Sequence, residues 1–117
     1  ELPHWVSVTI GQDGFDMSTA RPEGYQPPAT RDAVLALFDA NTAAARAALA
    51  GLGDGEIMAP WSLFQGKQTL FTMPKAAVLR TFVFNHMVHH RGQLSVYLRM
   101  HDVPLPSMYG PSADEAI

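Results

Sequence analysis

Two long segments with helical spacing do most to limit what this chain can fold into. In residues 30–52 the apolar side chains recur every three or four positions, as on the buried face of a helix: Leu35, Phe38, Thr42, Ala45, Leu49 and Leu52. Residues 75–101 form the second such segment. Pro74 stands at its start, and Asp102-Val103-Pro104 stops it. We therefore predict two long amphipathic helices over these ranges.

The rest of the chain predicts shorter elements. Residues 4–10 are rich in β-branched side chains and are either a strand or the last turns of a helix. Residues 11–29 contain three glycines and three prolines, which indicates a long loop. Residues 56–73 hold two short β-prone runs around Gln65-Gly66-Lys67, which predicts a small hairpin. The proline-rich tail after Asp102 is expected to be coil.

Composition narrows the class of protein. A chain of 117 residues fits a single domain, 1–117. The net charge of −3 without a basic cluster predicts no nucleic-acid partner. No apolar run approaches the roughly 18 residues of a membrane span, so we expect no membrane association. The absence of cysteine excludes disulfides, thiolate ligands and a cysteine nucleophile, and it fits a cytoplasmic protein.

Two histidines in the second long segment predict a metal site. On a helix turning about 100° per residue, His86 and His90 lie about 40° apart and share a sector with Leu79, Gln93 and Tyr97. An i, i+4 histidine pair can chelate one metal ion. The alternative is a pair of buried structural histidines, each with its own hydrogen bond. Burying two unpaired rings costs several kcal/mol, which favours the metal.

The predicted metal site needs a third ligand that its own helix does not supply, since residues 75–101 contain no Asp or Glu. His89 lies at the edge of the stripe and is not expected to bind. Gln93 either orients a ligand or bonds across the core. The candidates for the third ligand are a residue upstream of Glu1 and the following side chains: His4, Asp13, Asp16, Asp39, Asn41 and Asp102.

The stretch "NHMVHHRGQLSVYLRMHDVPLPSMYGPSADE", residues 85–115, resembles the C-terminal signature of the DinB/YfiT-like metalloenzyme superfamily. "ELPHWVSVTI" near the start gives weaker support. The resemblance implies an all-α fold, a four-helix up-and-down bundle that holds a divalent metal on three histidines. Two of them map onto His86 and His90. The third would fall about one turn before Glu1, with His4 a weak substitute, so the first helix and part of the site are expected to be missing.

The resemblance also implies a function. Relatives in this superfamily resemble S-transferases and isomerases that use small bacterial thiols. We therefore expect a divalent-metal enzyme, with Zn or Ni, that directs a small thiol cosubstrate at a small-molecule substrate. One alternative is a metal-dependent hydrolase, and another is a non-catalytic metal-binding or stress-response interaction module. The resemblance further implies a homodimer. Catalytic residues beyond the metal ligands stay unassigned.

Overall fold

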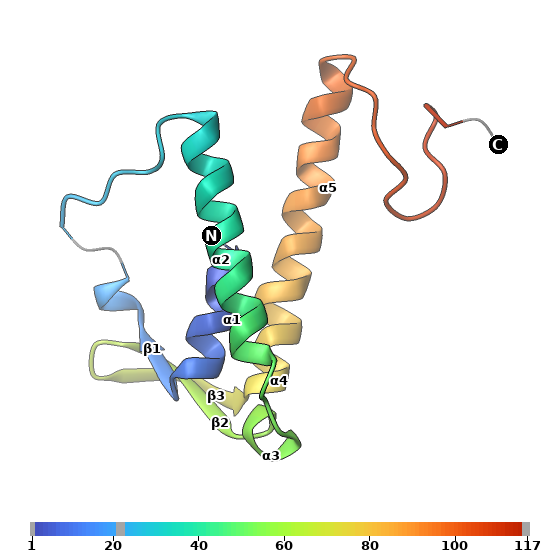
Figure 1. Cartoon of the computed structure of the whole chain (residues 1–117). Helices are drawn as coiled ribbons and strands as arrows, with labels where there is room; N and C mark the ends of the chain where they lie inside the picture. Colours follow the sequence, from blue (N-terminus) through green and yellow to red (C-terminus); the bar gives the residue numbers. More distant parts are fainter. Residues whose placement is uncertain (1, 21–22, 116–117) are drawn as a thin grey trace. The chain divides into compact units, whose positions relative to one another are not determined.

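The structure is a computed structural model that describes residues 2–20 and 23–115 (Figure 1). It divides into two compact units, residues 1–84 and residues 85–117. We call them the N-terminal and C-terminal units and describe each by itself.

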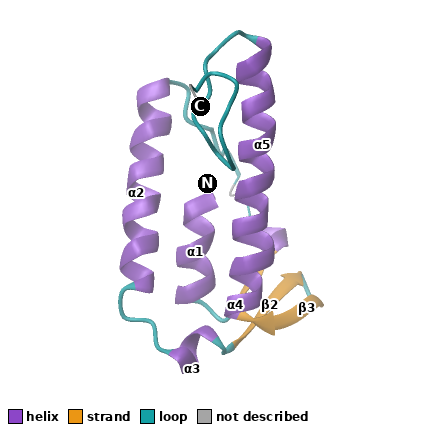
Figure 2. Ribbon diagram, turned by 90° about the vertical axis from the view of Figure 1, so that its right-hand side faces the viewer, coloured by secondary structure: helices purple, strands orange, loops and turns teal. Residues whose placement is uncertain are grey.

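Two helices form the helical layer of the N-terminal unit. Helix α1 (Leu2–Gly11) and helix α2 (Arg31–Leu49) lie side by side (Figure 2). The sequence colours of Figure 1 show that they run in the same direction. Thr30 caps α2, because its Oγ1 accepts a hydrogen bond from the Ala33 N–H. The long connection between the two helices is needed because the chain must return along their length before α2 can begin. The helix predicted from residue 30 onward is confirmed.

The N-terminal unit also contains a three-stranded sheet. It contains β1 (Gly14–Asp16), β2 (Pro60–Gln65) and β3 (Gln68–Pro74) in the order β1-β2-β3. Strands β2 and β3 are antiparallel and turn at Gly66, whose φ of 58° favours glycine. The predicted hairpin is therefore confirmed.

The all-α prediction is wrong, because the N-terminal unit is mixed α/β. The predicted loop 11–29 contributes β1, which pairs in parallel with β2 and places Gly14 opposite Ser62. A Cβ on Gly14 would lie 2.6 Å from the Ser62 carbonyl oxygen, so the close pairing depends on this glycine. A three-residue strand has too few positions to show an alternating pattern, and its partner lies far away in the sequence.

The core of the N-terminal unit joins α1, α2 and the residues before Phe84. Its buried members include Val6, Ala45, Leu79 and Val83. Trp61 of β2 is only 2% exposed. Ala45 is the only buried residue of α2, so the predicted buried stripe is wrong for its larger side chains, which are exposed.

A buried lysine ties the end of α1 to the start of helix α4 (Lys75–Val78). The Lys75 Nζ donates to the Ile10 carbonyl oxygen at 2.9 Å and lies 3.3 Å from the Asp13 carboxylate. The last carbonyl groups of a helix have no partner within that helix. Lys75 supplies such a partner for the last turn of α1. The short helix α3 (Asp54–Ile57) comes just before β2 in the chain.

The second predicted helix, 75–101, is not a uniform α-helix. After α4 the residues Leu79–Phe84 are π-helical, and helix α5 (Asn85–Met100) belongs to the C-terminal unit. A π-helix bonds i to i+5, so it does not turn 100° per residue. The predicted sector that joined Leu79 to the histidines therefore does not hold.

The C-terminal unit consists of α5 and the tail, residues 103–115, which leaves the end of the helix and loops back (Figure 1). The tail is coil, as predicted, but it is bonded to the helix. The Arg99 guanidinium donates to both carboxylate oxygens of Asp114, at 2.9 and 2.7 Å. Asp114 also accepts from the Leu105 N–H. This bidentate pair holds the two ends of the tail together.

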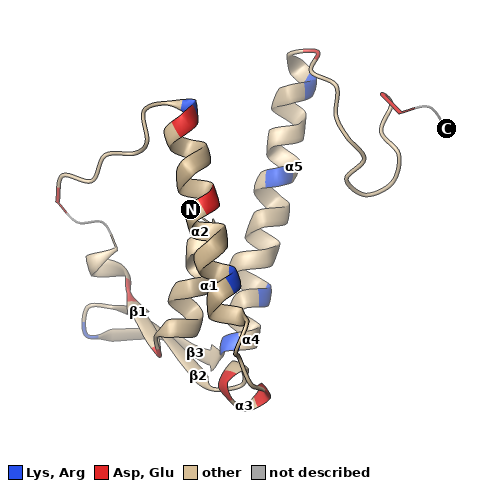
Figure 3. Cartoon of the chain, in the orientation of Figure 1, with Lys and Arg blue, Asp and Glu red and all other residues tan. Residues whose placement is uncertain are grey.

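Charged and apolar side chains are both widely exposed. Lys and Arg are scattered along the ribbon and mixed with Asp and Glu (Figure 3). Among the described residues, no helix is both long and apolar enough to cross a membrane. Large apolar side chains stand exposed on two helices, including Val34, Leu35 and Phe38 of α2 and Leu94 and Tyr97 of α5. The homodimer that would cover such surfaces stays a prediction.

Candidate metal centre

The two histidines predicted to bind metal lie on successive turns of α5 and converge. The Nε2 atoms of His86 and His90 are 2.7 Å apart, and the ring centroids are 4.5 Å apart. An i, i+4 spacing brings two side chains of a helix onto one side, so this placement follows directly from the sequence. The structure therefore brings together the pair that the spacing predicts.

The geometry of the pair suits two ligands of one ion. A zinc ion bonds imidazole nitrogen at about 2.0–2.1 Å, which requires nitrogens about 2.9 Å apart at a right angle and about 3.3 Å apart at the tetrahedral angle. The observed 2.7 Å between the Nε2 atoms is shorter by a few tenths of an ångström. A small rotation of either exposed ring would open the pair enough, so the two residues fit a divalent metal.

Gln93 fixes the second histidine. Its Oε1 lies 3.2 Å from the Nδ1 of His90. An amide oxygen only accepts hydrogen bonds, so a hydrogen bond at this contact requires the proton of the ring on Nδ1. The sequence allowed Gln93 either to orient a metal ligand or to form a hydrogen bond across the core. In the structure its Oε1 contacts His90 of the same helix.

The structure does not bring a third ligand to this pair. Within residues 2–20 and 23–115, no group of three or more His, Cys, Asp or Glu side chains could hold a metal ion. Two of the candidate acids have other partners: Asp13 pairs with Lys75, and Asp16 accepts from Ser18 and Gly66. A ligand upstream of Glu1 lies outside the described residues. The described site therefore holds two of the three expected ligands.

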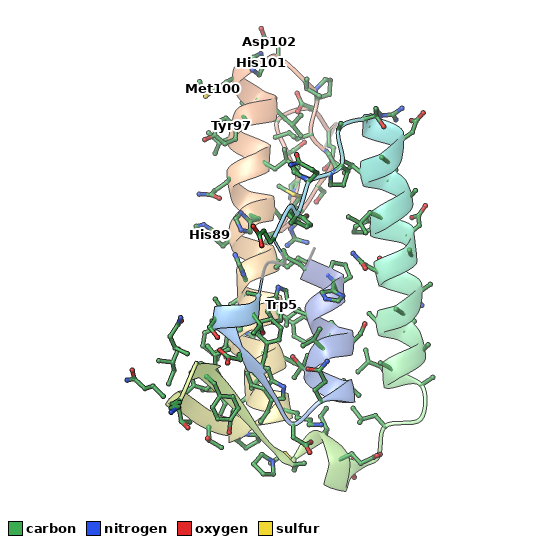
Figure 4. The ribbon with its side chains drawn as sticks, turned by 90° about the vertical axis from the view of Figure 1, so that its left-hand side faces the viewer. Trp5, His89, Tyr97, Met100, His101 and Asp102 are labelled. Carbon is green, nitrogen blue, oxygen red and sulfur yellow. The ribbon has the colours of Figure 1, made fainter. Side chains whose placement is uncertain are left out.

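His4 lies in the N-terminal unit, on α1, where its ring is 6.4 Å from that of Trp5. His89 meets the ring of His90 edge-on at 5.2 Å and projects from α5 (Figure 4). It does not join the nitrogen pair. The prediction that His89 stays out of the site therefore agrees with its position.

The predicted burial of the histidine pair is wrong. No residue of α5 is buried, and both His86 and His90 are exposed. The prediction relied on Leu79, whose burial belongs to the core of the N-terminal unit. The cost of burying unpaired rings therefore gives no support to the predicted metal site. The convergence of the two nitrogens is the observation that supports this site.

Sequence reasoning missed two charged contacts. Lysine is almost never buried without a partner, and the buried Lys75 has one in the Ile10 carbonyl oxygen. Arg99, near the end of α5, binds Asp114 of the tail. No local pattern in the sequence identifies either pair, because each joins residues that are distant along the chain.

Comparison with known proteins identifies relatives. The sequence model of the DinB family matches residues 3–116. The uncharacterized protein YrdA of Bacillus subtilis (strain 168) is 40% identical over 43 residues, which are 37% of this chain and 25% of that protein. The match thus spans about a quarter of this curated relative. No solved structure matches the chain significantly.

Proposed function

Because the chain belongs to the DinB family, we propose that it is a divalent-metal-dependent enzyme whose ion is held by His86 and His90. The observation that carries the proposal is the 2.7 Å approach of their Nε2 atoms. Two neutral nitrogens aimed at one point either share a proton or share a cation. Imidazole ligands suit zinc and nickel, among other metals.

The chain's own residues bind and orient in this function. His86 and His90 supply two nitrogen ligands, and Gln93 holds the ring of His90. The exposure of both rings leaves room for a small-molecule substrate beside them. A divalent ion bound there would supply Lewis acidity and favour the thiolate form of a bound thiol.

We propose a thiol-dependent S-transferase or isomerase as the reaction class. The chain contains no cysteine. Any thiol in the reaction must therefore come from a small cosubstrate. In a transfer, the thiol loses its proton and its sulfur attacks an electrophilic carbon of the substrate. The new C–S bond replaces the bond to a leaving group, which departs with the electron pair, and the product is a thioether.

A second candidate is a metal-binding module without turnover. It is favoured by the lack of a third ligand among the described residues. Two histidines alone would bind a metal weakly, and no catalytic residue beside them is assigned. Stoichiometric metal together with thiol transfer would favour the enzyme.

Calorimetric titration with zinc and with nickel tests the proposed metal site. We expect about one ion per chain in the wild type and loss of that binding in the double variant His86→Ala, His90→Ala. The helix content by circular dichroism should stay unchanged, because the capping and apolar spacing of the helices do not involve these rings. The matched control is His89→Ala, which removes a neighbouring imidazole that does not converge and should retain the metal.

Unchanged zinc affinity in the double variant would show that the pair is not the site. The reaction class needs a separate assay, in which a small thiol and an electrophilic acceptor are incubated with the loaded protein. Thioether formation that depends on His86 and His90 supports the transferase. Metal binding with neither thioether formation nor thiol-dependent isomerisation of the acceptor supports the module.

A further inference from the structure

We infer that Gln93 is a positioning residue that locks His90 in the tautomer needed to bind a metal through Nε2. This inference deepens the proposed function, on which its metal-binding part rests. It concerns the protein before any ion is bound, so it can be tested without a metal.

The contact that carries the inference lies within one helix. Residues three apart on a helix are neighbours, which puts the Gln93 Oε1 3.2 Å from the Nδ1 of His90. The hydrogen bond made by one imidazole nitrogen sets the state of the other. With the proton fixed on Nδ1, the neutral ring of His90 presents a bare Nε2.

The partner ring has the opposite tautomer. Because the Nε2 of His90 accepts, the Nε2 of His86 must carry the proton that lies in their 2.7 Å contact. For both rings to present Nε2 to one cation, the proton of His86 would have to leave Nε2, and Nδ1 would have to be protonated to keep the ring neutral. His90 needs no such change, because Gln93 has already prepared it.

Ligating histidines commonly donate their second N–H to a carbonyl or carboxylate oxygen, and loss of such a partner lowers metal affinity by about 10–100-fold. Gln93→Met removes the acceptor but keeps the length and the helix propensity of the side chain. Gln93→Glu restores an acceptor at the same position. Ser95→Ala is the matched control, because Ser95 bonds the Gly92 carbonyl and not a histidine.

Nitrogen-15 NMR of the metal-free protein at about pH 8, where imidazoles are mostly neutral, reads the tautomer directly. We expect His90 to show a protonated Nδ1 in the wild type, in Gln93→Glu and in Ser95→Ala. In Gln93→Met its signal should move toward the Nε2–H form that free histidine prefers. The spectrum of His90→Ala assigns the signal.

Zinc titration of the same four proteins gives the second readout. We expect affinity to fall about 10–100-fold in Gln93→Met and to recover in Gln93→Glu. An unchanged His90 tautomer in Gln93→Met would overturn the inference even if the wild type binds zinc. A tautomer that changes as expected in a wild type without zinc affinity would uphold the positioning role and reject the proposed function.

Discussion

Replacing Gly14 by alanine tests the contact on which the sheet depends. The added Cβ would lie 2.6 Å from the Ser62 carbonyl oxygen and 2.8 Å from the Phe64 ring. Both distances are shorter than real side chains show. The ring can rotate, but the carbonyl belongs to the backbone of β2, so β1 must move away from its partner strand.

The magnitude follows from two opposing effects. Overpacking of this kind costs about 1–3 kcal/mol. Replacing glycine by alanine also restricts the unfolded chain, which stabilises the fold by about 0.4–1 kcal/mol. We therefore expect Gly14→Ala to lower the free energy of unfolding by about 1–2 kcal/mol. Gly11→Ala is the matched control, because a Cβ at Gly11 meets nothing within 4 Å. It should be neutral or slightly stabilising.

Urea denaturation followed by tryptophan fluorescence measures this difference. Trp5 reports on the strand because its ring meets that of Phe15, the residue after Gly14, edge-on at 4.8 Å. A shift of β1 should therefore change the native emission of Gly14→Ala as well as its midpoint. Equal stability of the two alanine variants, with unchanged emission, would show that β1 does not approach β2 this closely.

Three further predictions concern the charged contacts and the assembly. Lys75→Met should lower the free energy of unfolding by about 1–3 kcal/mol, because the Ile10 carbonyl loses a charged donor. Asp13→Asn should lower it by less than about 1 kcal/mol, because Asp13 is 93% exposed. Equal losses of stability in urea denaturation would contradict the view that Lys75 acts through the Ile10 carbonyl. The hydrogen bond from Arg99 holds the pKa of Asp114 below its usual value. The bond is therefore present above the ordinary aspartate pKa of about 3.9 and is lost as the pH falls through the lowered pKa of Asp114. The NMR signal of the Leu105 amide should move only in that acid range, and a change near neutral pH would refute the contact. Light scattering should give the mass of a homodimer, and a well-behaved monomer would reject that prediction.

The parts of the fold that could be predicted are those fixed by local patterns. The α2 helix follows from its 3–4 spacing and its Thr30 cap, and the hairpin follows from Gly66 between two β-prone runs. Strand β1 could not be predicted, because its three residues gain their conformation only by pairing with a distant strand. Such non-local pairing leaves no periodic trace in a short segment.

The same division applies to the candidate site. His86 and His90 converge because the spacing of a single helix places them together. Their exposure was not foreseen, because the prediction extended one regular helix through Leu79–Phe84, which is π-helical. The convergence of the two rings therefore follows from α5 alone, whereas their predicted burial depended on a regular helix through Leu79–Phe84 and is wrong.

Because Lys75 is buried, the two lysines of the chain should react at different rates with amine-directed reagents. Lys67 stands exposed in the hairpin turn, where an amine-reactive reagent can reach it. The amine of Lys75 is covered and bonded to a carbonyl, so a reagent must wait until the N-terminal unit opens locally. A fluorophore can thus be attached at Lys67 in the native protein. The rate at which Lys75 is then labelled, followed by mass spectrometry, would measure how fast this unit opens.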